Sequence, residues 1–115
     1  GYLFIRRFIM IETKYNISFS QETISAELKK LTNQIYKLLP FREEQVDWEM
    51  PLTTILEELA GMDRLILDDK YHEILFPLMC KLEGLFLLKE ENQFFLYRRT
   101  IFECLSLISS IIRTL

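Results

Sequence analysis

Glycine, proline and cysteine are scarce in this chain of 115 residues, which contains three, three and two of them. So few glycines and prolines exclude collagen-like, linker-like and turn-dense β architectures. Two cysteines are too few for the disulfide framework of a small secreted module. No apolar run approaches the roughly 20 residues that a membrane-spanning helix needs. We therefore expect a globular domain that does not enter a membrane.

The chain also has little net charge. It contains 14 basic and 17 acidic residues, which gives a net charge of −3. A mildly acidic domain has no overall attraction to nucleic acid or to anionic lipid. Half of the residues are hydrophobic, which excludes a disordered chain. The length is typical of a single domain.

The first nine residues do not resemble the start of a gene product. Arg6 and Arg7 can be encoded by AGG-AGG, the core of a bacterial ribosome-binding site, and Met10 follows after a short spacer. We expect Met10 to be the true start and residues 1–9 to be a translated leader or an artificial extension. The alternative, in which residues 1–9 belong to the fold, stays open. The segment lacks the features of a secretory signal, so we expect a cytoplasmic bacterial protein.

Apolar and polar residues alternate between residues 11 and 19, which is typical of a half-buried strand. Because a lone strand needs a partner, we expect an extended N-terminal arm that pairs within the chain or with another copy. Lying along a helical surface would satisfy the same pattern. Its apolar members Ile11, Tyr15 and Ile17 are candidate contacts with a partner.

Four amphipathic segments follow the arm, each with apolar residues at steps of three and four. The first is expected to begin after Ser20 and to stop at Pro40, because a residue before proline avoids helical geometry. The second has Pro51 in its first turn and Gly61 as its stop.

The third segment begins at Asp68 or Asp69, which can cap a helix. Pro77 inside it predicts a kink, and Phe76 is expected to widen its apolar face. Gly84 either ends this helix or lies within it.

Residues 85–97 allow two interpretations. One long amphipathic helix from about residue 93 accounts for the apolar and the polar stripe of the last segment together. Alternatively, Leu85–Leu88 and Phe94–Tyr97 form a β-hairpin before a shorter helix. We favour the long helix, and hence an all-α, four-helix bundle-like domain over residues 10–115 with an extended N-terminal arm. The alternative is an α+β winged helix with a hairpin at 85–97.

Few groups are available for catalysis or metal binding. His72 is the only histidine, and with Asp69 it supplies only half of a dimetal motif. Cys80 and Cys104 lie in apolar segments, which predicts buried free thiols. A glycine-framed nucleophile and a phosphate-binding glycine loop are both missing from the sequence. We expect no enzyme, no metal ion and no cofactor.

Two groups of residues are candidates for binding. Trp48 forms an apolar cluster with Phe41 and Val46, either as a lid over one end of the bundle, which we favour, or as a binding hot spot. The basic pairs Lys29-Lys30 and Arg98-Arg99 can contact nucleic acid only if they converge in space.

A small domain buries a limited fraction of its surface, so this apolar composition predicts burial against a partner. The arm and the last helix are the expected surfaces, in a homo-oligomer or against another protein. We expect a non-catalytic adaptor, inhibitor or accessory subunit. The alternative function is that of a winged-helix, DNA-binding transcriptional regulator, with Lys70–Glu83 as the recognition helix and Leu85–Tyr97 as the wing.

Overall fold

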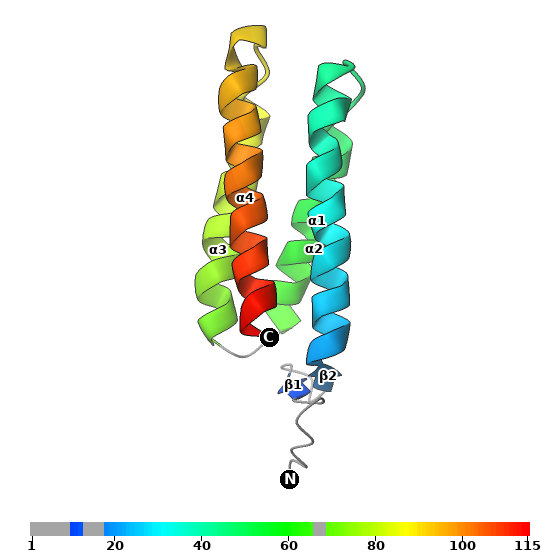
Figure 1. Ribbon diagram of the computed structural model, residues 1–115, viewed down its shortest axis with the longest axis vertical. Coiled ribbons are helices and arrows are strands. Elements are labelled where there is room, and N and C mark those ends of the chain that lie inside the picture. Colours follow the sequence, from blue (N-terminus) through cyan, green and yellow to red (C-terminus); the bar gives the residue numbers. More distant parts are fainter. Residues whose placement is uncertain (1–9, 13–17, 66–68) are drawn as a thin grey trace.

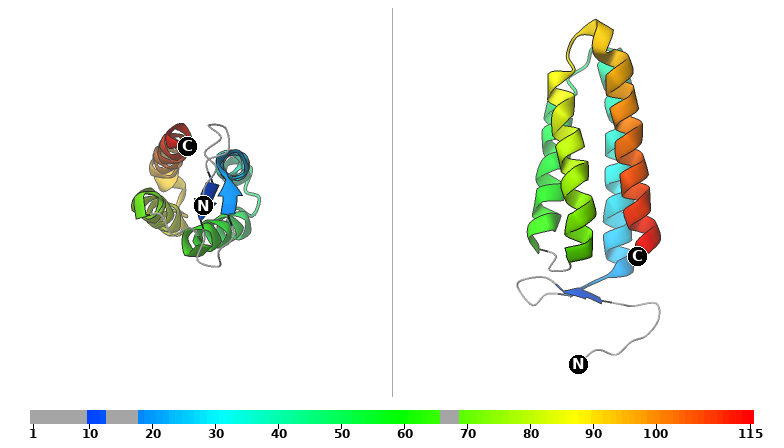
Figure 2. Two further views of the ribbon diagram at one scale, coloured as in Figure 1. Left: turned by 90° about the horizontal axis from the view of Figure 1, so that it is seen from below. Right: turned by 90° about the vertical axis from the view of Figure 1, so that its left-hand side faces the viewer.

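Four helices form an all-α bundle in the computed structural model, which describes residues 10–12, 18–65 and 69–115 (Figure 1). The helices are α1 (Gln21–Glu43), α2 (Glu49–Leu65), α3 (Asp69–Gly84) and α4 (Phe94–Thr114). They run alternately in opposite directions, and each packs against two neighbours (Figures 1 and 2). The first and last helices, α1 and α4, lie side by side, which closes the bundle. The predicted fold class is confirmed.

One apolar stripe from each helix fills the core, because leucine and isoleucine recur at helical spacing. Examples that are fully buried are Leu28, Leu31 and Ile35 in α1 and Leu78 in α3. Burial of each such side chain stabilises the fold by about 1.5–3 kcal/mol. This repeated contribution outweighs local signals that would end a helix early.

The predicted stop of α1 at Pro40 is wrong, because the helix continues to Glu43. Pro40 is exposed in the last turns, where a single missing N–H is tolerated next to the buried Leu38 and Leu39. The left-handed residue that terminates the helix is Gln45, two residues beyond Glu43, with a φ of 58°. The amides of Gln45 and Val46 close the end on carbonyls of the last turn, as in a Schellman motif.

The predicted stop of α2 at Gly61 is also wrong, because α2 continues to Leu65. Gly61 does not adopt the left-handed conformation that ends a helix at glycine. Asp47 caps the start of α2, since its Oδ1 accepts hydrogen bonds from the amides of Glu49 at 3.0 Å and Met50 at 3.3 Å. The carboxylate satisfies amides that the helix itself leaves unpaired.

In α3 the helix continues across Pro77, which is exposed. The predictions for Phe76 and Cys80 are wrong, because both side chains are exposed. They lie on the face opposite the buried residues Tyr71, Leu75, Leu78 and Leu82. Helical position therefore outweighs residue type here. Asp69 begins α3, and Asp68 lies outside the described residues.

The alternative hairpin at 85–97 is wrong, since two 3-10 turns at Leu85–Leu87 and Glu91–Gln93 precede α4. Glu90 and Gln93 form a capping box, in which the Glu90 amide donates to Gln93 Oε1 at 3.0 Å. The long last helix begins at Phe94, as favoured from the sequence.

The N-terminal arm pairs with itself. Strands β1 (Met10–Glu12) and β2 (Ser18–Ser20) are antiparallel, with Ile11 opposite Phe19. They lie beyond the end of the bundle at which α1 begins (Figure 1). The expected single strand over residues 11–19 is therefore replaced by two short ones. Tyr15, Ile17 and the expected leader, residues 1–9, lie outside the described residues.

Candidate partner-binding surfaces

Trp48 packs inward at the end of the bundle where the α1–α2 and α3–α4 connections meet. Its ring stacks against Phe86, with centroids 6.3 Å apart, and meets the edge of Tyr97 at 5.0 Å. Phe41 is half-buried, and Val46 is 49% exposed. These contacts fit the interpretation of Trp48 as a lid better than that of a free hot spot.

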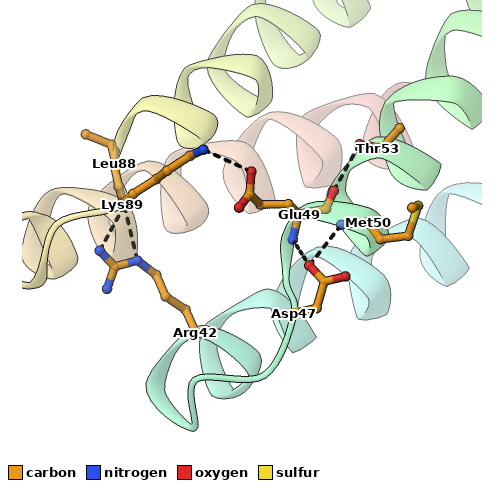
Figure 3. Close-up of polar contacts among 7 residues, drawn as sticks. All are labelled: Arg42, Asp47, Glu49, Met50, Thr53, Leu88 and Lys89. Atoms are coloured by element: carbon orange, nitrogen blue, oxygen red, sulfur yellow. Dashed lines mark hydrogen bonds and ion pairs between the residues drawn. The ribbon is translucent and has the colours of Figure 1, made fainter.

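Arg42 ties the end of α1 to the α3–α4 connection (Figure 3). Its Nε and Nη2 donate to the Leu88 carbonyl at 3.2 and 2.8 Å, and Nη2 donates to the Glu90 carbonyl at 2.7 Å. The guanidinium also lies over the rings of Phe94 at 5.2 Å and Tyr97 at 4.9 Å. A planar guanidinium can donate hydrogen bonds from its edge while it lies against aromatic rings.

An open hollow of about 900 Å³ lies at this end of the bundle, and its lining includes Arg42, Asp47, Glu49 and Lys89. Lys89 pairs with Glu49 at 3.2 Å, and Arg42 is held by the carbonyls described above (Figure 3). Both cations are therefore engaged within the protein. This engagement argues against the hollow as a site for a small anion.

Tyr97 is fully buried beneath this cluster. Its hydroxyl has no hydrogen-bond partner within the described part of the chain. Burial raises the pKa of the phenol well above its usual range, although the nearby Arg42 charge opposes this shift. Tyr97 therefore acts as a neutral core residue.

His72 and the two cysteines lie in different surroundings. His72 Nδ1 lies 2.6 Å from Oδ1 of Asp63, which joins α3 to α2. Within residues 10–12, 18–65 and 69–115, no group of three His, Cys, Asp or Glu side chains is arranged to hold a metal ion. Cys104 is buried, and burial raises the pKa of its thiol to about 12. Cys80 is the exposed thiol of the two.

Exposed aromatic residues gather along α4 and the adjacent part of α1, and sequence reasoning missed them. Phe95 is 79% exposed, Tyr36 is 54% exposed and Phe102 is 38% exposed. Tyr36 meets Phe102 edge to face with centroids 6.4 Å apart, and the Arg98 guanidinium lies 4.9 Å from the Phe102 centroid. The sequence could have indicated them, because their positions do not fit the spacing of the buried apolar residues in their helices.

We call Phe95, Arg98, Phe102 and Ser106 the α4 outer stripe. Together with Arg99 and Glu103 they line a shallow hollow of about 520 Å³. Exposed aromatic residues next to arginine are the residue types enriched at protein–protein contacts.

The two basic pairs do not form one patch, although α1 and α4 are neighbours. Lys30 pairs with Glu27 at 3.9 Å, and Arg99 pairs with Glu103 at 3.5 Å. Lys29 precedes Tyr36 by seven residues, or about 10 Å along the helix axis. Because the helices are antiparallel, Arg98 lies beyond the Tyr36–Phe102 contact in the other direction. The convergence that nucleic-acid binding needs is not observed in this part of the chain.

Charge is distributed unequally between the two sides of the bundle. Helix α1 carries four basic and three acidic residues, and α4 carries three and one. In contrast, α2 carries one basic and four acidic residues, and α3 carries two and three. The aromatic surface therefore lies on the positive side, and the opposite side is negative.

No family model, curated protein or solved structure matches this chain. Among the described helices, none is both long enough and apolar enough to cross a membrane. The surface features above are therefore the basis for a functional proposal.

Proposed function

We propose that this protein acts by protein–protein association, without catalysis of its own, as an adaptor, inhibitor or accessory subunit in the bacterial cytoplasm. The observation that carries the proposal is the exposed aromatic surface of Tyr36, Phe95 and Phe102. Contact with a partner would remove these rings from water, and burial of one phenylalanine stabilises by about 1.5–3 kcal/mol. Arg98, which already lies over Phe102, adds a charged group of the kind found in binding hot spots.

The cytoplasmic part of the proposal is supported by the thiols. Cys80 and Cys104 are both free, and Cys80 is exposed. An exposed thiol persists in a reducing compartment and is prone to oxidation outside it.

The alternative of a DNA-binding winged helix lacks the β-hairpin that would form its wing. Residues 85–97 instead contain two 3-10 turns and the first residues of α4, as described above. The expected recognition helix, α3, presents Glu73 and Glu83 to solvent, whereas readout of DNA bases relies mainly on Lys, Arg, Asn and Gln. We therefore retain protein–protein association alone.

The test is affinity capture from a lysate of the bacterium that encodes the chain, with an untagged copy of the protein added. The baits are the tagged protein, the double variant Phe95→Ser with Phe102→Ser, and the control Leu87→Ser. Leu87 is as exposed as Phe95 but lies outside the α4 outer stripe. We expect the captured amount of at least one protein, or of the untagged copy, to fall about tenfold or more when the bait is the double variant. The control bait should capture the same amount as the unaltered protein. Identical capture by all three baits would show that the proposal is wrong.

A further inference from the structure

Helix α3 carries a second outward stripe, which we call the α3 outer stripe: Asp69, Glu73, Phe76, Cys80 and Glu83. Steps of four, three, four and three place these residues on one helical face, and all of them are exposed. Phe76, at its centre, is 68% exposed. Its three carboxylates form no ion pair within the described residues.

The two stripes are complementary in charge and in apolar content. The α4 outer stripe has a basic residue between two phenylalanines, and the α3 outer stripe has a phenylalanine between acidic residues. Phe76 can enter the hollow beside Phe95 and Phe102, where aromatic rings favour edge or offset contacts. Glu73 and Glu83 lie ten residues apart, about 15 Å along the helix, and so would flank the Arg98-Arg99 pair.

We propose that the partner of the α4 outer stripe is the α3 outer stripe of a second copy of this chain. This inference rests on the proposed function and names one occupant for its surface. A contact of α4 with α4 would bring together two surfaces of net positive charge, and a contact of α3 with α3 would bring together two of net negative charge. Like charges that face each other across an interface are unfavourable, so the pairing of different stripes is preferred.

Such a contact is heterologous, because the α4 outer stripe lies toward α1, where Phe102 meets Tyr36, and so faces away from the α3 outer stripe. The stripes belong to different helices, and both remain exposed in one copy. One copy can therefore bind two others, and the assembly grows beyond a dimer into a ring or an open chain. The opposite net charges of the two sides of the bundle also steer copies into this orientation.

The experiment measures mass by light scattering and sedimentation velocity over a wide range of protein concentration. Variant A is Arg98→Glu with Phe102→Ser, and it keeps the α3 outer stripe. Variant B is Glu73→Lys with Phe76→Ser, and it keeps the α4 outer stripe. All four substituted side chains are exposed, and circular dichroism and thermal unfolding check that both variants fold.

We expect the unaltered protein to grow beyond a dimer with concentration, and each variant alone to associate about tenfold or more weakly. An equimolar mixture of A and B should form a heterodimer and stop there, because one intact stripe of each kind remains. Added salt should weaken both assemblies. Leu87→Ser should associate like the unaltered protein.

The proposal is overturned if the unaltered protein stays monomeric, if A or B associates normally, or if their mixture stays monomeric or exceeds a dimer. If the protein is monomeric and capture of another protein still depends on Phe95 and Phe102, only the self-association is wrong. If neither effect is seen, the proposed function is wrong as well.

Discussion

The two cysteines differ in their surroundings, and this predicts different reactivity. Cys80 is exposed, whereas Cys104 is buried and burial raises the pKa of its thiol to about 12. Because the thiolate is the reactive species, we expect one thiol of the folded protein to react rapidly with a disulfide reagent at about pH 8. Cys80→Ser should remove the rapid phase, and Cys104 should react after denaturation. Two rapid thiols in the folded protein would contradict this prediction.

The buried phenol of Tyr97 should make the folded protein less stable at high pH. Its pKa is raised in the folded state by burial, whereas in the unfolded chain it is about 10. Above that pH the unfolded chain releases a proton that the folded protein retains, so the free energy of unfolding falls as pH rises. The stabilisation from this group is fully present below about pH 10.

Tyr97→Phe should remove this component of the pH dependence, as measured by urea unfolding from about pH 7 to about pH 11. It should also raise the free energy of unfolding at neutral pH by about 1 kcal/mol, because a buried hydroxyl without a partner is lost. Tyr36→Phe, at an exposed ring, is the matched control. An unaltered pH profile for Tyr97→Phe would argue against a phenol that stays protonated in the fold.

At the scale of the elements, periodicity was sufficient for the cores of the helices and insufficient for their ends. The buried stripe of α4 from Tyr97 to Ile111 follows the predicted spacing. Pro40 and Gly61 were misleading because each is a local signal worth about 1–3 kcal/mol. The buried leucines near them together contribute more free energy of folding, so both helices continue past these residues.

The end of α1 at Gln45 had no sequence signal, because glycine usually occupies a left-handed position at a helix end. Gln45→Gly should therefore raise the free energy of unfolding by about 0.5–1 kcal/mol, since glycine adopts a positive φ without steric cost. Thermal or urea unfolding measures the change. Gln45→Ala is the control and should give no gain, because alanine keeps a Cβ atom. Equal effects of glycine and alanine would show that backbone strain at residue 45 is negligible.

The candidate surfaces were less predictable than the helices. A stripe assigns apolar residues to the core, and Tyr36, Phe76 and Phe95 lie off the stripes of their helices. Trp48 was favoured as a lid, and the structure packs it against Phe86. Residue type alone could not distinguish the two cases, because the difference depends on how the connections fold back over the bundle end.

The whole molecule consists of two helical hairpins, α1–α2 and α3–α4, that share one core and are linked at one end by a side chain. Arg42 provides this link, through the carbonyls of Leu88 and Glu90 and the rings of Phe94 and Tyr97. Arg42 and its partners are far apart in the sequence, so helical periodicity could not reveal their contact. Its loss should weaken the whole bundle, because the guanidinium fixes the end of α1 to the α3–α4 connection.

Arg42→Ala should lower the free energy of unfolding by about 2–4 kcal/mol, from hydrogen bonds made by a charged donor and from cation–π contacts. Arg42→Lys should recover only part of this loss, because an ammonium cannot donate in the plane that the two carbonyls require. Urea unfolding followed by circular dichroism measures both, with Lys37→Ala as an exposed control on the same helix that should change stability by less than about 0.5 kcal/mol. Full rescue by lysine would mean that the stabilisation by Arg42 comes from its positive charge alone, and not from the geometry of the guanidinium.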